Sequence, residues 1–402
     1  MDPFEGEISA GSIEYEPVSV KDVLVEMKDT AELLIDLSFS AILHQHHDLA
    51  REVLRLEERM DLLELRARMS LLMAARNPDD AERLAPVLGI VAATDQISDA
   101  AGDIAKILLE DAGLPEAMRT TLPEAIESLE RAEVTADSAY AGRTLVDIDL
   151  ESETGVRVIA LRRGAEWLFD PGPETTVEAG DVAFLRGTET DLGPVVETLT
   201  GEPYELAEPE SPEIADLERA IDTIVHMKNV SELAVDLAYS SVLFDSRPLA
   251  EEVRNLEIEV DALQSRFTAW ALKAAGEAED PVRIRGLMIL ASATEEISDA
   301  AIGISEGVLR ELDVHPVVHL AVQESDEIIT RIVVEPGSEL VDADVIDGRL
   351  DADAGMSAIA IRRPEDGWLL IADADARLRA HDVLIAKGTR NAEESVQPLS
   401  ES

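Results

Sequence analysis

The sequence predicts an α+β protein of several domains, in which two three-helix bundles alternate with two small domains of mixed helix and strand. The first reason is length, because 402 residues are enough for two to four separate hydrophobic cores. The second is that the second half repeats the first. The third is that, within each half, hydrophobic residues at helical spacing give way to short β-rich runs.

The repeat has an offset of 200 residues. It is read in three pairs of segments: "VEMKDTAELLIDL" (25–37) and "VHMKNVSELAVDL" (225–237), "ATDQISDAA" (93–101) and "ATEEISDAA" (293–301), "VIALRRG" (158–164) and "AIAIRRP" (358–364). The halves align without a gap over about eighty residues, and they diverge in length only later. A two-part unit is therefore used twice.

The first part of each unit is helical. Between 20 and 43, apolar residues recur at helical spacing and keep to one stripe, from Val23 to Ile42. The segments 49–75 and 80–110 show the same period, and "RNPDD" is predicted to break the chain between them. Three such helices form a bundle. We expect one bundle over 18–115 and another over 216–313.

The second part of each unit reads as a small α+β domain. "VRVIALRRG" and "VAFLRGT" are predicted strands, with the turn-rich "DPGPETTVEAGD" before the second. "SLERAEVTADS" predicts an earlier strand, and "GRTLVDIDL" predicts a short helix. In the second half "MSAIAIRR" and "DVLIAKGT" are the matching strands. The expected domains cover 128–200 and 320–398.

The charge is extreme, with 85 acidic residues against 34 basic ones and a formal net charge of −51. This excess, with only six lysines, is typical of proteins from salt-accumulating halophiles, in which concentrated salt screens the repulsion. It argues against nucleic acid as a partner, since phosphate binding needs clustered cations. There is no cysteine, no long apolar run and no signal-peptide pattern, so we expect a cytoplasmic protein.

On these segments the sequence resembles two known modules. The helical part resembles the PhoU-like family, whose bundles carry an acidic E-x-x-x-D pattern, here in "ATDQISDAA" and "ATEEISDAA". The small domain resembles the TrkA-C domain, which is the C-terminal regulatory domain of RCK proteins. The residues that carry this are "GRTLVDIDL", "VIALRRG" and "TTVEAGDVAFLRGT", with "GSELVDADV", "AIAIRRP" and "ARLRAHDVLIAKGT" in the second half.

The resemblance implies a regulatory subunit of a cation transport system, chiefly for potassium, that senses a small ligand or ion through its TrkA-C domains. Its partner would be a membrane transporter or channel, which would place the protein at the membrane periphery. The usual nucleotide-binding motif G-x-G-x-x-G is absent. The alternatives are a PhoU-type metal-binding regulator of phosphate uptake and a free-standing metal-buffering protein. Pairing of the repeats within the chain and a homo-oligomer both remain open.

Paired carboxylates four residues apart share a helix face and are the sequence's candidates for a divalent metal site. The resemblance places such a site on the helices of Asp95 and Glu295. The candidate ligands are Asp95, Asp99, Glu57 and Asp61, with Glu295, Asp299, Glu257 and Asp261 in the second half. A further pair, Glu32 and Asp36, recurs as Glu232 and Asp236. In so acidic a chain these spacings also arise as surface and capping positions.

The candidate ligand-binding residues are two repeated arginine pairs, Arg162–Arg163 and Arg362–Arg363, each at the end of a predicted strand. Because successive strand residues point to opposite faces, one arginine of each pair can reach a cleft or a domain interface. An anionic ligand would suit it, and the resemblance implies a cyclic dinucleotide as one candidate. The alternative is an ion pair with one of the many carboxylates.

Catalysis finds no support in the sequence. There is no cysteine nucleophile, no G-x-S-x-G motif and no triad-like placement of histidines, so we expect no enzyme. The cluster "HQHH" at 44–47 has metal-ligand spacing, but the second half has "FDSR" at the same place. A connecting loop is the favoured interpretation of the cluster.

Overall fold

The structure is a computed structural model of the whole chain. It describes residues 19–43, 45–110, 112, 128–148, 150, 154, 156–164, 166–169, 171–187, 189–204, 215–278, 281–312, 315–325, 328–338, 340–346, 349–350, 356–363, 367–370 and 376–388.

The first bundle consists of three long helices, namely α1 (Val20–Leu43), α2 (His47–Ala74) and α3 (Pro78–Leu109). The predicted break at 76–80 is wrong at its C-terminal end, because α3 already begins at Pro78. The cause is local: Asn77 accepts a hydrogen bond from the Asp80 amide at 2.9 Å, and proline suits the first position of a helix. The chain between α2 and α3 is therefore shorter than the motif indicates.

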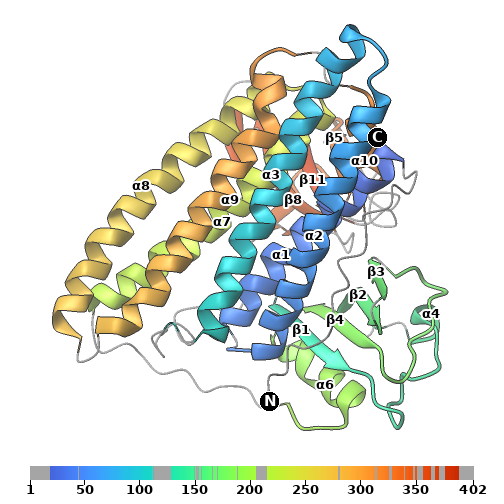
Figure 1. Cartoon of the computed structure of the whole chain (residues 1–402), viewed down its shortest axis with the longest axis vertical. Coiled ribbons are helices and arrows are strands. Elements are labelled where there is room, and N and C mark those ends of the chain that lie inside the picture. The colour runs from blue at the N-terminus through green and yellow to red at the C-terminus, as the bar shows by residue number, and fades with distance from the viewer. Residues whose placement is uncertain are drawn as a thin grey trace.

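The second bundle repeats the first with α7 (Ala215–Leu243), α8 (Arg247–Glu277) and α9 (Arg285–Leu309), and a 3₁₀ turn over Pro281–Ile284 leads into α9. Figure 1 shows the two bundles side by side, with α3 and α9 at their junction. The fold class expected from the repeat, helical bundles alternating with small α+β domains, is confirmed.

The junction of the bundles is an antiparallel pairing of α3 and α9. Equivalent residues meet at its centre, where the Gln96 side-chain amide donates to the Glu296 carbonyl at 3.5 Å. Further along the same two helices, a Cβ at Gly303 would lie 2.9 Å from that of Ala93. Contact between equivalent positions is the geometry of a two-fold interface, so the halves of one chain pack like the two subunits of a symmetric dimer.

Contacts between the first helices obey the same symmetry. The Lys28 ammonium lies 5.3 Å from the ring centroid of Tyr239, and that of Lys228 lies 5.9 Å from the centroid of Phe39, at the position equivalent to Tyr239. Each lysine also pairs with the glutamate four residues ahead of it, Glu32 or Glu232. The Tyr239 hydroxyl lies 3.2 Å from the Thr94 hydroxyl, which adds a buried polar contact between the bundles.

The first small domain is a four-stranded antiparallel sheet in the order β1-β4-β2-β3. Its elements are β1 (Ser128–Glu133), α4 (Leu145–Ile148), β2 (Arg157–Arg163), β3 (Glu166–Phe169), β4 (Val182–Gly187) and α6 (Glu189–Thr200). The short helix that "GRTLVDIDL" predicts is therefore present as α4. Helix α6 and strand β3 have no counterpart in the sequence-based prediction.

The second small domain repeats this sheet as β5-β11-β8, with β9 also paired to β8, and extends it with short strands. Its elements are α10 (Val317–Glu324), β5 (Ile328–Val333), β6 (Asp344–Ile346), β7 (Arg349–Leu350), β8 (Met356–Arg363), β9 (Gly367–Leu370), β10 (Ala376–Arg377) and β11 (Val383–Gly388). Helix α10, which the sequence does not predict, lies against both α1 and α7.

Each small sheet is buried on both faces. In β4, Val182 and Phe184 belong to the core that runs through both bundles, whereas Ala183 and Leu185 belong to the domain's own core. This follows from the two-residue period of a strand, and it explains why β4 reads as a continuous apolar run instead of alternating. The same alternation decides which charged side chains face the helices.

Candidate functional site

The bundle-facing side of β2 ends in Arg162, which reaches helix α2. Its Nε and Nη2 atoms donate to the two carboxylate oxygens of Glu52 at 3.0 and 2.6 Å. The Glu52 side chain is only 1% exposed, so this bidentate pair is desolvated at the carboxylate. Arg162 therefore joins the first small domain to the first bundle.

Two more arginines share the same carboxylate. Arg55, one turn along α2, lies 2.6 Å from Glu52 Oε1, and Arg131 of β1 lies 3.5 Å from it. The buried Nε of Arg131 has no hydrogen-bond partner among the described residues. Three guanidinium groups thus converge on one carboxylate, which leaves a local excess of positive charge.

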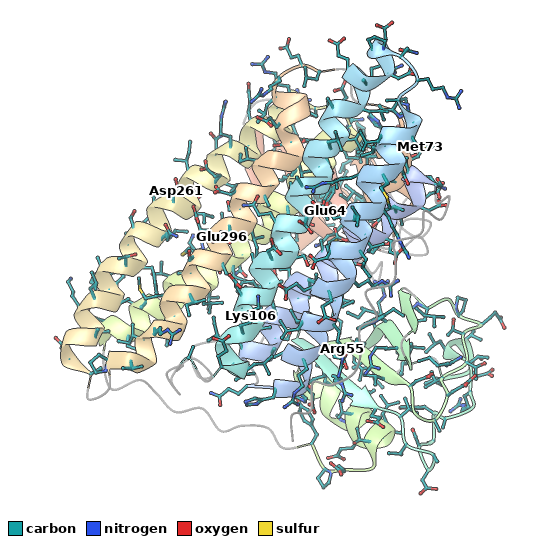
Figure 2. All side chains as sticks on the ribbon, in the orientation of Figure 1. Arg55, Glu64, Met73, Lys106, Asp261 and Glu296 are labelled. Carbon is teal, nitrogen blue, oxygen red and sulfur yellow. The ribbon has the colours of Figure 1, made fainter. Side chains whose placement is uncertain are left out.

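An open cleft of about 520 Å³ lies beside this cluster, lined by Arg55, Arg59, Arg162, Gly164 and Trp167. The Trp167 ring stacks on Phe184, with centroids 4.8 Å apart, so its orientation is held by the core. Figure 2 shows Arg55 on the side of α2 that approaches the first small domain. Guanidinium groups beside an indole ring suit an anion that carries a planar group.

Arg163, the neighbour of Arg162, points to the opposite face and has a different environment. Its Nε and Nη2 atoms each donate to Asp181 at 2.8 Å, and Nη2 also donates to the Thr176 carbonyl. Burial acts to raise the pKa of Asp181, but hydrogen bonds from Arg163 and the Glu178 amide hold that pKa below its usual value. Arg163 therefore fastens the turn before β4.

Arg363 does the same in the second half. Its Nε lies 3.4 Å from Asp382 Oδ2, and the Arg379 amide donates to the same oxygen at 2.9 Å. Arg362 is exposed, and within the described part of the chain it has no ion pair. Of the four predicted ligand-binding arginines, Arg162 lines a cleft, whereas Arg163 and Arg363 pair with the buried carboxylates of Asp181 and Asp382.

The arginine cluster is not repeated in the second half. The counterparts of Arg131 and Arg162, Arg331 and Arg362, are kept but exposed. On α8, Asn255 and Glu259 stand where α2 has Arg55 and Arg59. The two halves thus share the cations of the sheet and differ in those of the helix, which makes the cluster a feature of the first half.

A second set of contacts joins each small domain to its bundle at equivalent positions. Arg186 at the end of β4 pairs with Asp36 of α1, and Lys387 at the end of β11 pairs with Asp236 of α7 at 2.8 Å. Neither cation is among the site residues predicted from the sequence. The sequence pattern that could have identified them is a basic residue in both halves, next to the last residue of the final strand.

The predicted metal ligands of the first bundle line the surface between α2 and α3. Burial, followed by the charges of Glu64, Asp99 and Asp61, raises the pKa of Asp95 to about 7. Asp99 lies one turn further along α3 and Asp61 is exposed on α2. Glu57 pairs with Lys106 at 3.2 Å.

The second bundle repeats this row of carboxylates. Burial, followed by the charges of Asp299 and Asp261, raises the pKa of Glu295 to about 7. Burial and then Asp103 of α3 raise the pKa of Glu296, so the rows on α3 and α9 act on each other across the junction. Figure 2 shows Glu296 on α9 and Asp261 on α8.

The described residues contain no group of three or more carboxylate or imidazole side chains placed to hold one metal ion. The candidate pairs lie in rows along the helices and do not converge on a point. The pairs on the first helices have other contacts, because Glu32, Asp36, Glu232 and Asp236 all pair with lysine or arginine. Metal binding by the Asp95 and Glu295 rows stays a prediction.

The histidine cluster lies at the start of α2. The His46 imidazole accepts a hydrogen bond from the Leu49 amide at 3.4 Å and so caps the helix, and His47 is the first helical residue. His44 lies outside the described residues. The described helices also include none that is long and apolar enough to cross a lipid bilayer.

Comparison with known proteins identifies both modules twice. The PhoU domain model matches residues 24–108 and 224–308, and the TrkA-C domain model matches 129–198 and 329–400. The four matches alternate along the chain in the order that the repeat predicts. The resemblance found in the sequence is therefore confirmed.

Two curated relatives match a short part of the chain. The Ktr system potassium uptake protein C of Bacillus subtilis is 32% identical over 60 residues, which are 15% of this chain and 27% of that protein. The probable potassium channel protein 2 of Methanocaldococcus jannaschii is 34% identical over 59 residues, again 15% of this chain and 17% of that protein. The chain thus matches about a quarter or less of each relative.

Solved structures show only a distant likeness. The GsuK RCK domain is 15% identical with a TM-score of 0.19, and the match covers 67% of this chain and 62% of that one. The GsuK channel is 13% identical with a TM-score of 0.21, covering 78% and 65%. At these TM-scores the likeness supports no conclusion about this chain.

Proposed function

Because this chain is built from PhoU and TrkA-C domains in tandem, we propose that it is a non-catalytic regulatory subunit of a potassium transport system. Its TrkA-C domains would sense a small ligand or ion, and its bundles would pass the change to a membrane transporter or channel. The names of both curated relatives refer to potassium uptake or a potassium channel, which supports the ion. The alternative in phosphate uptake has no such support.

The observation that carries this proposal is a pair of equivalent ion pairs, one in each half, between a TrkA-C domain and its helical bundle. Arg186–Asp36 and Lys387–Asp236 connect the last strand of each TrkA-C domain to the first helix of its bundle. A movement of either sheet would be transmitted to α1 or α7. These two helices contact each other, because Lys28 of α1 lies over the Tyr239 ring of α7 and Lys228 of α7 lies over the Phe39 ring of α1. Packed side chains and ion pairs of this kind can carry energetic coupling between distant sites.

The proposal places the protein in the cytoplasm beside its transporter. A net charge of −51 favours an environment of concentrated salt, where a Debye length of about 3 Å at 1 M screens the repulsion among the chain's own acidic residues. A rise in potassium would then change both the substrate of the transporter and the electrostatics of the regulator.

The test is affinity purification of the chain from its native membranes in molar KCl, followed by mass spectrometry. A potassium channel or transporter in the eluate, and potassium flux that changes when the chain is added to vesicles holding that partner, are the expected results. A phosphate transporter in the eluate would replace the proposal with the phosphate alternative. An eluate free of membrane proteins would remove the transport role.

A further inference from the structure

We propose that the cleft between α2 and the first TrkA-C domain binds a nucleotide, with its phosphate on Arg55 and Arg162 and its base against Trp167. The inference deepens the proposed function. It rests on that function only where nucleotide binding is said to regulate transport. Binding itself depends on the described residues alone. Arg55 belongs to α2, Arg162 to β2 and Trp167 to β3, so the ligand would contact the helix and the sheet at once.

Charge is the first reason. Three guanidinium groups of the cluster, on Arg55, Arg131 and Arg162, meet the single carboxylate of Glu52, and Arg59 beside them pairs with Glu26. In a chain with a net charge of −51, such a surplus of cations is unusual. A phosphate group compensates it, because guanidinium binds phosphate oxygens bidentately.

Shape is the second reason. The cleft of about 520 Å³ is open to solvent, and it is within the size range of small-molecule sites. Trp167 lies directly across the β2–β3 ladder from Arg162, so the indole ring and the guanidinium are neighbours. The indole ring stacks on Phe184, and Trp167 is also one of the residues that line the cleft. An aromatic side chain offers a stacking surface for a base of any kind, because every base has a π-face.

The position of Glu52 turns binding into a structural signal. Its carboxylate is the contact through which Arg162 of the sheet holds α2, and Arg55 uses the same oxygen. A phosphate that attracts these guanidinium groups competes with Glu52 for them. Binding would therefore weaken the contact between the TrkA-C domain and the bundle. The ion pair between Arg186 and Asp36 would remain as a second contact between them.

The second half provides a matched control. Arg362 and Trp368 correspond to Arg162 and Trp167, but α8 has Asn255 and Glu259 in place of the helical arginines. We therefore expect one nucleotide per chain. The equivalent substitutions in the second half should leave binding unchanged.

The experiment is isothermal titration calorimetry of the full chain with ATP, inorganic pyrophosphate and adenosine, in molar KCl and at lower salt. We expect one site for ATP, weaker binding of pyrophosphate and none of adenosine, with affinities that fall as salt rises. Arg55→Ala and Arg162→Ala should each weaken ATP binding about tenfold or more, whereas Arg362→Ala should not. Trp167→Leu should reduce the affinity for ATP to that for pyrophosphate.

Arg55 is the safer first variant, since its side chain is 55% exposed and its loss leaves the core intact. Glu52→Gln provides a readout that a purely structural role would not give, because removing the competing carboxylate should tighten ATP binding. The assignment would be overturned if the wild type bound no ATP, or if Arg55→Ala bound ATP as tightly as the wild type. It would also be overturned if Arg162→Ala and Arg362→Ala lost the same amount of ATP affinity.

Failure of the site and failure of the proposed function remain distinguishable. If ATP binds as expected but the chain leaves potassium flux unchanged, the site stands and the transport role falls. If the chain controls flux and no phosphate ligand binds at the cleft, the transport role stands and the site falls.

Discussion

Lys387 Nζ lies 2.8 Å from Asp236 Oδ2, and this contact ties the last strand of the second TrkA-C domain to helix α7. The Asp236 side chain is 11% exposed and that of Lys387 is 29% exposed, so water screens the pair only in part. The equivalent residues of the first half, Asp36 and Arg186, form the same contact. A relationship kept in both halves is a good place to test how the domains are coupled.

Breaking this pair should release the second TrkA-C domain from its bundle. We expect Lys387→Met to lower the free energy of unfolding by about 1 kcal/mol, as measured by chemical denaturation in molar KCl. The swap Lys387→Asp with Asp236→Lys should recover most of that loss. Arg310→Met is the control, because Arg310 and Glu306 form an exposed pair whose removal should change little. No recovery in the swap would contradict a direct coupling.

Close approach of α3 and α9 depends on the absence of a side chain at Gly303. A Cβ there would lie 2.9 Å from the Cβ of Ala93, whereas one at Gly276 meets nothing within 4 Å. Gly303→Leu should therefore destabilise the chain by about 1–3 kcal/mol through overpacking. Gly276→Leu should be neutral or slightly stabilising, because leucine is the better helix former. Thermal unfolding of the two variants separates these effects.

The carboxylate row on α3 makes stability depend on pH. Burial and neighbouring charges raise the pKa of Asp95 to about 7, above its value in the unfolded chain. The folded state then holds the extra proton between about pH 4 and 7, so this group's contribution to stability falls as pH rises through that window. At pH 8 the folded state holds a charge that it disfavours.

Asp95→Asn should therefore raise the melting temperature at pH 8, and the gain should shrink as the pH is lowered from 7 towards 4. Molar KCl should reduce the gain in part, because salt screens the charges of Glu64 and Asp99 but not the burial. Glu82→Gln on the exposed side of α3 removes the same charge and should give little gain. Equal gains from both variants would show a general charge effect.

The buried hydroxyl of Tyr239 bonds across the bundle junction. It lies 3.2 Å from the Thr94 hydroxyl, and burial chiefly raises the tyrosine pKa above its usual value. Tyr239→Phe should cost about 1 kcal/mol of unfolding free energy, the usual value of one hydrogen bond. Tyr140→Phe in the first small domain is the matched control. Denaturation curves that coincide for wild type and Tyr239→Phe would refute the contact.

Arg163 and Arg162 should behave differently although they are adjacent. Removal of Arg163 leaves the buried Asp181 carboxylate without its guanidinium partner, so Arg163→Ala should destabilise the chain by roughly 2 kcal/mol. Arg363→Ala should act in the same direction through Asp382. Neither should change ATP affinity in calorimetry. Loss of ATP binding in a folded Arg163→Ala protein would move the ligand to the other face of β2.

Much of the architecture could be predicted because its signals are local. The helices follow from apolar residues at a period of 3.6, and the strands β2, β4, β8 and β11 follow from short β-rich runs between turn residues. The exact start of α3 depended on capping by Asn77, and α6 and α10 are short helices without a clear period. Repetition strengthens the predictions for the helices and main strands, because their patterns occur in both halves.

Only part of the candidate site could be predicted from the sequence. Arg162 was marked by its place at a strand end, and alternation along the strand indicated that one arginine of the pair would face an interface. Its partners Glu52, Arg55 and Arg131 come from α2 and β1, and no spacing in the sequence relates them to β2.

The sequence by itself determined the repeat, the order of the four domains, the helices and main strands, and the acidic surface, because each is a property of composition or of neighbouring residues. The tertiary structure decided which carboxylate each arginine meets, that the two bundles pair within one chain, and that the arginine-lined cleft belongs to the first half. The last of these outcomes depends on residues of α2 and α8 that lie far from the strands in the sequence. There Arg55 and Arg59 in one half, and Asn255 and Glu259 in the other, give the same fold different electrostatics.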